Sequence, residues 1–438
     1  MARTTGCALL AGLAALVAVV STAIFLGVGG TDVAARAGRG AMAAGSAHTA
    51  VPAAAGSWVG TWSASPVAGE PSTADGYPGW SIRNVVHTSV GGTWVRVHLS
   101  NTFGSAPLVV AHATVARSAG TGGAAAAGGT MRVLTFAQRG SVTIPAGGAV
   151  VSDPVRLAVP QRADLLVTTY AALPSGPVTY HPNARQISFM AHGERTAEVS
   201  GVSYTTRTLF WRYVSAVDVL SSHAAGAVVF FGDSITDGLT STVGANHRWP
   251  DYLADGLMAS GDRRLRLGVL NQGISGNGVL RGGPEGGPSA LVRLDRDALS
   301  QTGARTMVVE LGINDIIRPP RATGARAVIA GLRQIVARGH ARGMRVIGGT
   351  LLPFEGHGAA YNPVTEAVRQ QVNAAIRAGT VYDAVIDFDK ALRDPYRPTR
   401  MRAAYDSGDH LHPSDAGYRR MAEAARPVLL GGTADAKA

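Results

Sequence analysis

The fold is decided by residues 227–238, which read AVVFFGDSITDG. The first five of these residues are apolar, and a short apolar run that ends at a glycine predicts a buried strand. Gly232 and Gly238 permit a tight turn from this strand into a helix. Ser234 is then predicted at the helix N-terminus, where backbone N–H groups and the helix dipole favour a developing negative charge. The stretch therefore predicts a strand, a tight turn with a serine on it, and a helix.

The same strand-to-helix pattern repeats through residues 226–430, where apolar strands alternate with longer segments of helical period. Within 326–342, Leu332, Ile335, Val336 and Gly339 recur at helical spacing, so we expect that helix to pack one face on a sheet. The alternation predicts an α/β domain with a parallel, doubly wound sheet. The predicted strands cover 227–231, 265–270, 306–311, 345–351 and 384–386, and the predicted helices cover 248–260, 289–299, 326–342, 365–378 and 414–429.

Residues 58–220 follow a different pattern, in which short alternating or β-branched runs lie between clusters of Gly, Pro and Ser. Examples are the segments 93–99, 108–115, 141–144 and 164–170. Many short strands separated by turn residues predict an antiparallel module that is sandwich-like or jelly-roll-like. The predicted boundaries are 56–222 for this β-rich module, 223–431 for the α/β domain and 432–438 for a disordered tail.

The N-terminal segment has the features of an export signal. An apolar run covers residues 8–28, longer than the ~7 to 15 residues of a usual signal core and close to the ~20 that span a bilayer. Residues 1–30 are predicted to be a signal peptide, or alternatively an anchor that tethers the chain to a membrane through residues 8–28. Residues 31–55 are mostly Ala, Gly, Ser and Thr, which predicts a flexible linker. We expect an extracellular, secreted protein, or alternatively a membrane-anchored one at the cell surface.

The distribution of charge and cysteine excludes several classes of protein. The chain of 438 residues has 40 Lys and Arg against 29 Asp and Glu, a formal charge of +11. The excess is +6 in residues 1–225 and +5 in residues 226–438, with no run of five like charges, so we expect no nucleic-acid partner. The single cysteine, Cys7, lies in the export segment. The mature chain is therefore expected to have no disulfide and no thiol nucleophile.

Polar residues follow three of the predicted strands and also occupy one turn near the C-terminus. In parallel α/β sheets the reactive groups gather at the carboxyl ends of the strands, so these segments are expected to lie close together. The four segments are 232–238, 271–277, 312–315 and 409–413.

Together these segments supply the groups of a serine hydrolase. Ser234 is a candidate nucleophile, and His412 is a candidate base that would take its proton on one ring nitrogen. Asp409, three residues before His412, would accept from the other ring nitrogen. The Gly273 N–H and the Asn314 side-chain amide are candidate donors to an oxyanion.

The motifs in these segments resemble the four blocks of the SGNH hydrolase (GDSL esterase/lipase) superfamily, and all four occur in order over about residues 226–430. They are Gly232-Asp233-Ser234, Asn271-x-Gly273-x-x-Gly276, Gly312-x-Asn314-Asp315 and Asp409-x-x-His412-Pro413. The conjunction of the four is highly specific, whereas Gly-Asp-Ser alone is weak. The resemblance implies a cofactor-free enzyme with a flavodoxin-like, three-layer α/β/α fold.

Carried over position by position, the resemblance implies that Ser234 is the nucleophile, His412 the base and Asp409 its partner. It implies an oxyanion hole made of the Ser234 and Gly273 backbone N–H groups and the Asn314 amide. One departure is Ile235, where the family motif has Leu, which is a conservative change. The β-rich module is an addition to the minimal domain and is similar to leaders in some secreted bacterial members.

Two further pairs of residues each have two possible roles. Pro353 and Phe354 come just after a predicted strand and could line an acyl or alcohol pocket, or could belong to ordinary loop packing. Trp58 and Trp62 could be stacking platforms for carbohydrate, or core residues of the β-rich module. No spacing of metal ligands is recognisable, so we expect no metal.

The sequence thus predicts an exported serine esterase that cleaves carboxylic esters through an acyl-enzyme, acting on short-chain acyl esters or on acetylated polysaccharide. One alternative is a lipase or lysophospholipase that acts on longer acyl lipids. A second alternative is a protein that mainly binds glycans or the cell envelope through its β-rich module and has minor hydrolase activity.

Overall fold

The computed structural model describes residues 56–262, 266–283, 286–318 and 323–431, which belong to one compact unit. The predicted signal peptide or anchor (1–30), linker (31–55) and tail (432–438) lie outside the described residues, as does Cys7. Within the described ranges, no helix has both the length and the apolar character that crossing a membrane requires.

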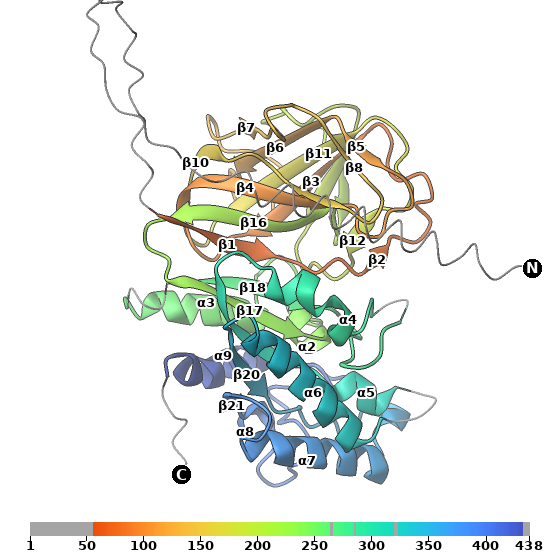
Figure 1. The fold of residues 1–438 in the computed structure, drawn as a ribbon, viewed down its shortest axis with the longest axis vertical. Coiled ribbons are helices and arrows are strands. Elements are labelled where there is room, and N and C mark those ends of the chain that lie inside the picture. The colour runs from red at the N-terminus through yellow and green to blue at the C-terminus, as the bar shows by residue number, and fades with distance from the viewer. Residues whose placement is uncertain (1–55, 263–265, 284–285, 319–322, 432–438) are drawn as a thin grey trace, which may run out of the picture. The chain divides into compact units, whose positions relative to one another are not determined.

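The C-terminal half contains a sheet of five strands that all pair in parallel (Figure 1). Its strands are β17 (Gly226–Gly232), β18 (Leu267–Gly273), β19 (Ala304–Glu310), β20 (Arg345–Gly349) and β21 (Ala384–Ile386). Their spatial order is β18-β17-β19-β20-β21, so the chain changes direction across the sheet after β18. Sheets of this kind bind ligands beyond the carboxyl ends of the strands at such a switch point, which here lies at the ends of β17 and β19.

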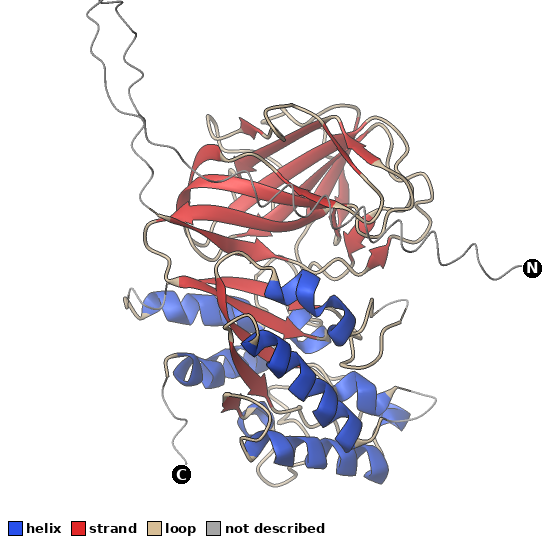
Figure 2. Ribbon diagram, in the orientation of Figure 1, coloured by secondary structure: helices blue, strands red, loops and turns tan. Residues whose placement is uncertain are grey.

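Helices surround this sheet, whereas strands and loops make up the preceding half (Figure 2). The helical segments are α2 (Ser234–Asp237), α3 (Trp249–Ala259), α4 (Ala290–Leu294), the π-helical η2 (Asp295–Leu299), α5 (Ile313–Ile317), α6 (Ala325–His340), the 3₁₀ turn η3 (Gly358–Ala360), α7 (Pro363–Arg377), α8 (Phe388–Leu392) and α9 (Asp415–Leu429). The helix predicted at 289–299 is therefore an α-helix that widens into a π-helical turn at Asp295.

Successive side chains of β17 are buried on opposite faces of the sheet. Val229 and Phe231 belong to a hydrophobic cluster that includes residues of α6 and α7. Val228 and Phe230 belong to a second cluster with residues of α3, α8 and α9. Because both faces of β17 are covered, its sequence is apolar without alternation, as a buried parallel strand requires.

One strand boundary differs from the prediction in a way that affects the site. The second strand was expected to end at residue 270, but β18 continues to Gly273. Asn271, Gln272 and Gly273 pair in register with the last three residues of β17, which end at Gly232. The loop at the carboxyl end of β18 therefore begins at Ile274.

Residues 57–221 form the β-rich module, in which every strand pair is antiparallel. The main sheets have the orders β1-β16-β4-β10, with β9 beside β4, and β14-β13-β3-β11-β6-β7; the smaller ones are β15-β12-β2 and β5-β8. The strands are β1 (Ser57–Ser63), β2 (Ala68–Gly69), β3 (Trp80–His87), β4 (Gly92–Ser100), β5 (Leu108–Val110), β6 (His112–Arg117), β7 (Arg132–Val133), β8 (Val142–Ile144), β9 (Ala149–Val151), β10 (Val155–Val159), β11 (Asp164–Ala171), β12 (Thr179–His181), β13 (Ser188–His192), β14 (Thr206–Thr208), β15 (Trp211–Arg212) and β16 (Val214–Ser221).

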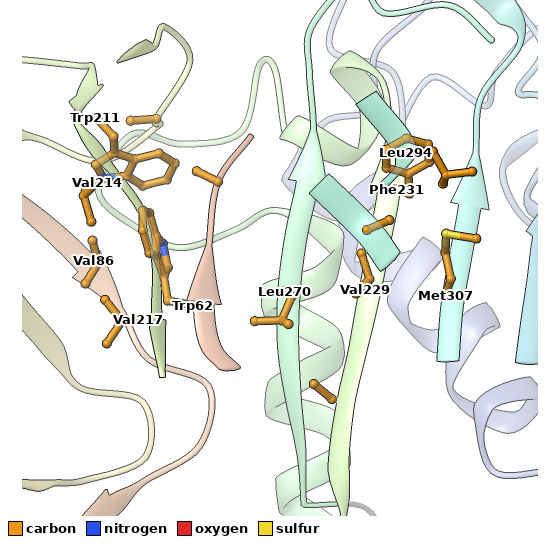
Figure 3. Close-up of a cluster of buried hydrophobic side chains, with 14 of the residues drawn as sticks. Trp62, Val86, Trp211, Val214, Val217, Val229, Phe231, Leu270, Leu294 and Met307 are labelled. Atoms are coloured by element: carbon orange, nitrogen blue, oxygen red, sulfur yellow. The ribbon is translucent and has the colours of Figure 1, made fainter. Parts of the chain in front are cut away.

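The β-rich module packs directly on the α/β domain through β1 and β18. A Cβ on Gly60 would lie 2.9 Å from a methyl carbon of Leu270, and a Cβ on Gly268 would lie 2.0 Å from the carbonyl oxygen of Gly60. Only glycine permits this approach of the two strands. One hydrophobic cluster therefore contains residues of both halves, including Trp62 and Leu270 (Figure 3).

The buried position of Trp62 decides between the two interpretations offered for it. Its ring packs edge-on against Trp211 with the centroids 4.9 Å apart, and both side chains are buried in the shared cluster. Trp62 is therefore a core residue of the module. Trp58 is partly exposed, and the Arg96 guanidinium lies 4.7 Å above its ring.

Candidate active site

Ser234 lies at the first position of α2, directly after β17. Asp233 caps this short helix, because its Oδ1 accepts from the Ile235 N–H at 3.0 Å. Gly238 ends the helix in the left-handed conformation with φ 91°. The turn between strand and helix holds the Ser234 hydroxyl at the carboxyl end of β17, with the backbone N–H of the same residue at the helix N-terminus.

The structure brings Ser234, His412 and Asp409 into one hydrogen-bonded chain. Ser234 Oγ lies 2.8 Å from His412 Nε2, and His412 Nδ1 lies 2.5 Å from Asp409 Oδ2. The carboxylate can only accept, so Nδ1 carries the proton, and Nε2 of the neutral ring accepts from the serine hydroxyl. The serine is thus paired with a base whose tautomer is set by Asp409.

Backbone hydrogen bonds hold Asp409 in place. Its Oδ1 accepts from the N–H groups of Leu411 and His412, at 2.9 and 2.8 Å. Partial burial would raise the pKa of Asp409, but the bonds from the His412 ring and from these N–H groups outweigh it and hold the pKa well below its usual value. Asp409 is therefore ionised wherever His412 can act as a base.

Asn314 reaches the same site from α5. Gly312, with φ 130°, makes the turn between β19 and this helix. Asn314 Nδ2 donates one hydrogen to the Asn277 carbonyl at 3.0 Å, which leaves the second N–H of the amide for another acceptor. The adjacent Asp315 accepts from the Val279 and Leu280 N–H groups at 2.6 and 3.0 Å, so the loop after β18 is tied to α5.

A cleft of about 830 Å³ opens over these groups. Both halves of the described chain contribute to its walls, since the β-rich module supplies residues from its loops and from β12. The lining residues are Pro71, Tyr180, Pro182, Asn183, Ser234, Leu239, Ser275, Gly276, Asn314, Ile317, Arg318, His357, Ala360, Leu411 and His412.

Gly273 does not lie with the other candidate oxyanion donors. Its N–H donates to Asn271 Oδ1 at 2.9 Å, and the residue lines a separate cavity with Trp62 and His181. The physical reason is the extension of β18, which places Gly273 in the sheet instead of in the loop. The prediction for Gly273 is corrected accordingly.

The second glycine of the same motif, Gly276, lies at the cleft. It lines the cleft with Ser234 and Asn314 and has φ 74°, which favours glycine. No hydrogen bond from its N–H to another described residue is present. The second glycine of the motif Asn271-x-Gly273-x-x-Gly276 was the signal in the sequence that could have identified it.

Pro353 and Phe354 do not line the cleft either. Both are buried, and Phe354 packs with Ile313 and Leu411, which are the neighbours of Asn314 and His412 in the chain. Phe354 therefore packs behind the segments that carry Asn314 and His412, and neither residue faces the cleft. The cleft wall in this region comes from His357 and Ala360.

Two buried carboxyl groups lie behind the nucleophile. Burial raises the pKa of Asp233 to about 7, and burial together with the neighbouring Asp233 raises that of Glu310 well above its usual value. Both Glu310 oxygens and Asp233 Oδ2 are buried with no donor among the described residues. A proton shared between the two carboxyl groups satisfies Asp233 Oδ2 and one Glu310 oxygen, since two neighbouring buried carboxylates do not both ionise.

The β-rich module reaches the site through His181, which sequence reasoning did not identify. His181 Nε2 lies 2.9 Å from Asp237 Oδ1 on α2, and Asp237 Oδ2 accepts from the Ser275 N–H at 2.9 Å and from its hydroxyl at 2.6 Å. No local motif marks a residue that meets its partner only across two modules of the fold.

Comparison with known proteins identifies one family. The model of the GDSL-like lipase/acylhydrolase family matches residues 230–420. No curated protein matches the chain.

Several solved structures are similar to part of the chain. A GDSL-like lipase from Bacteroides thetaiotaomicron has 20% identity and a TM-score of 0.35, covering 47% of this chain and 89% of its own. A catalytic mutant of an acetylxylan esterase from Geobacillus stearothermophilus has 24% identity and a TM-score of 0.37, covering 48% and 95%. A member of the lipolytic protein G-D-S-L family from Veillonella parvula has 19% identity and a TM-score of 0.34, covering 47% and 98%. Through the family match, residues 230–420 of the α/β domain are assigned to the GDSL-like lipase/acylhydrolase family of the SGNH hydrolase superfamily.

Proposed function

We propose that the chain is a serine esterase that hydrolyses carboxylic esters through an acyl-enzyme on Ser234. The observation that carries the proposal is the hydrogen-bonded chain from Ser234 through His412 to Asp409, with contacts of 2.8 and 2.5 Å, at the edge of an open cleft. A serine hydroxyl becomes a competent nucleophile at neutral pH when an adjacent base takes its proton.

In the first half of the reaction, Ser234 Oγ attacks the ester carbonyl carbon while its proton moves to His412 Nε2. Asp409 keeps the Nδ1 proton in place and stabilises the imidazolium that forms. His412 then gives its Nε2 proton to the departing alcohol oxygen, the ester C–O bond breaks, and the acyl group stays on Ser234. In the second half, water repeats the attack with His412 as its base and releases the acid.

The negative charge on the carbonyl oxygen needs donors that are in place beforehand. We propose the Ser234 and Gly276 backbone N–H groups and the free N–H of the Asn314 amide for this role. All three residues line the cleft. Fixed donors of this kind cost no reorganisation when the charge develops, so they stabilise the transition state more than the substrate.

We further propose short-chain acyl esters or acetylated polysaccharide as substrates of an exported enzyme. An open cleft of about 830 Å³ with polar and apolar residues in its walls accommodates a bulky alcohol such as a sugar unit of a polymer. A narrow apolar channel would instead favour the long acyl chain of a lipid.

The test combines covalent labelling with a substrate series. The full chain is treated with a fluorophosphonate, which phosphonylates activated serines with loss of fluoride, and the labelled peptide is identified by mass spectrometry. Ser234→Ala should lose both the label and hydrolysis of 4-nitrophenyl acetate, whereas Ser300→Ala, on an exposed serine of the same domain, should keep both. Labelling elsewhere, or near-normal turnover by Ser234→Ala, contradicts the proposal. The same assay over acyl chains of two to twelve carbons, together with acetylated xylan, separates an esterase of short acyl groups from a lipase.

A further inference from the structure

The described residues that line the cleft include a positively charged side chain and no negatively charged one. Among the described residues that line it, Arg318 is the only one with a permanent charge, His357 and His412 are the imidazoles, and none is Asp or Glu. Asp315 is turned away, because its oxygens accept from the N–H groups of Val279 and Leu280. A concave site with one uncompensated cation attracts anions.

Arg318 is held next to the candidate oxyanion donors. Its backbone N–H donates to the Asn314 carbonyl at 3.3 Å, at the end of the helix that carries the Asn314 amide. Its guanidinium lies against Gly276, where an added Cβ would be 2.2 Å from Nη2, and near Gly286, where an added Cβ would be 3.3 Å from Nη1. The absence of side chains on these glycines makes room for the guanidinium.

The guanidinium of Arg318 makes no hydrogen bond or ion pair with the described residues, in contrast to the buried arginines of the same domain. Arg293 donates to the carbonyls of Gly232 and Gln272, and Arg369 pairs with Glu366 and Asp389. Arg318 thus presents its donors to the cleft, where a planar fork matches a carboxylate or phosphate group.

We propose that Arg318 binds an anionic group, a carboxylate or a phosphate, on the ester substrate, close to the ester that is cleaved. This inference rests on the proposed esterase function and names the class of its substrates. Because Arg318 touches Gly276, the anionic group lies beside the reacting carbonyl and within a few bonds of it.

The experiment compares three acetate esters of meta-substituted phenols, two with an anionic substituent and one with a neutral substituent. The full chain is assayed with 3-acetoxybenzoate and 3-acetoxyphenyl phosphate, which are anionic, and with methyl 3-acetoxybenzoate, which is neutral. Wild type should show a higher kcat/KM for at least one anionic ester, and the better of the two identifies carboxylate or phosphate as the preferred group. Arg318→Gln should reduce that preference about tenfold or more, as expected for losing a hydrogen bond between charged groups. Arg318→Lys should keep part of it.

The controls separate failure of this inference from failure of the esterase proposal. Arg326→Gln removes an exposed arginine at the start of α6 and should change none of the three rates. Wild type without preference for either anionic ester, or Arg318→Gln with an equal loss on all three, overturns the anion site. Hydrolysis of the neutral ester by wild type, and its loss in Ser234→Ala, would still support the esterase.

A second and independent observation concerns His181 in β12. The ring is buried, with Nδ1 2.8 Å from the Ser65 carbonyl and Nε2 2.9 Å from Asp237 Oδ1. Both partners can only accept, so both ring nitrogens carry hydrogen and His181 is an imidazolium. Burial would lower the pKa of His181, and the charge and hydrogen bond of Asp237 outweigh burial and raise it.

Asp237 also binds the loop that carries Gly276. Its second oxygen accepts from both the N–H and the hydroxyl of Ser275, at 2.9 and 2.6 Å. The hydrogen bonds therefore run from the β-rich module to α2 and on to the residue before Gly276. Rigid support from outside the reacting groups determines how accurately oxyanion donors are placed.

We infer that His181 is a positioning residue, through which the β-rich module sets the geometry of the oxyanion loop. This inference also rests on the proposed esterase function. It makes the module an integral part of the catalytic site, to which it further contributes Pro71, Tyr180, Pro182 and Asn183 as cleft wall.

The test measures kcat and KM separately for variants of the two residues. His181→Gln and Asp237→Asn should each lower kcat on 4-nitrophenyl acetate about tenfold with KM changed less than about twofold, since misplaced donors affect the transition state more than substrate binding. The double variant should lose less than the product of the two single losses, because both act through one contact.

His98→Gln is the matched control. His98 Nε2 pairs with Asp218 Oδ2 at 2.8 Å, also within the β-rich module, and does not line the cleft. An equal loss of kcat in His98→Gln, or unchanged kcat in His181→Gln, overturns the inference. If His181→Gln fails to fold, Ser275→Ala, which removes only one of the two bonds to Asp237, should still lower kcat at unchanged Tm, and normal kcat in it would count against the inference.

Discussion

Gly273 lies opposite Gly232 in the register of β18 and β17, inside the sheet and not in the loop above it. A Cβ at Gly273 would lie 2.3 Å from the backbone nitrogen of Asp237 in α2, so this glycine permits the helix to pack on the strand end. Gly276, three residues later, lines the cleft. The two glycines of one motif therefore have different tasks, one in packing and one in the site.

Exchange of each glycine for alanine should separate these tasks. Gly273→Ala should lower the unfolding free energy by about 1–3 kcal/mol, because the added methyl group has no room against the α2 backbone. Gly276→Ala should lower kcat more than stability, because its Cβ displaces the Arg318 guanidinium and strains a residue at φ 74°. Thermal unfolding and turnover of 4-nitrophenyl acetate are measured for both. A Gly273→Ala variant of normal stability that has lost its turnover would return the oxyanion role to Gly273.

Asn314→Ala should lower kcat about 10²–10³-fold with little change in KM, which is the usual effect of removing one oxyanion donor. The amide also donates to the Asn277 carbonyl, so Tm is measured alongside the kinetics. A change confined to KM would show that Asn314 binds substrate and does not stabilise the transition state.

Asp409→Asn should retain more activity than Ser234→Ala. The asparagine keeps an oxygen that can accept from the His412 ring, but it no longer stabilises the imidazolium by charge. Rates of 4-nitrophenyl acetate hydrolysis are compared for both variants at the same pH. Losses of equal size would mean that Asp409 is as indispensable as the nucleophile, contrary to this ranking.

Glu310→Gln should flatten the pH dependence of stability. The pKa of Asp233 is raised to about 7, so between its usual value and pH 7 the folded chain holds a proton that the unfolded chain has released. The unfolding free energy therefore falls as pH rises through this window. Burial and the neighbouring Asp233 raise the pKa of Glu310 well above its usual value, so Glu310 contributes to the same fall, and the uncharged amide of Glu310→Gln removes this contribution. Tm is measured from pH 4 to 8, with Glu423→Gln, on the surface, as control. Identical slopes in Glu310→Gln and wild type would contradict the coupling of the two carboxyl groups.

Phe354→Ala should act on stability and not on substrate choice. The ring is fully buried against Ile313 and Leu411, so its removal leaves a cavity that costs about 3–5 kcal/mol. The acyl-chain preference, measured as relative kcat/KM over the ester series, should stay as in wild type. A shifted preference at unchanged Tm would restore the predicted contact of Phe354 with substrate.

Local patterns in the sequence predicted the architecture of the α/β domain. The apolar strand 227–231 with its glycine turn, and the helical spacing in 326–342, predicted a parallel sheet between helices, and a parallel sheet is present. The four motifs predicted membership of the SGNH superfamily, which the family match confirms. Such patterns are local, since burial and turn chemistry repeat within a few residues of each other.

Only the tertiary structure decided which groups share the cleft. It extended β18 by three residues and so moved the loop from Gly273 to Gly276, it turned Phe354 inward, and it brought His181 of the β-rich module against Asp237. It also placed the Arg318 guanidinium against Gly276, in a cleft whose described lining residues include no carboxylate. The physical reason is that strand ends, side-chain direction and charge pairing depend on partners far away in the chain, and no local pattern of residues records those partners.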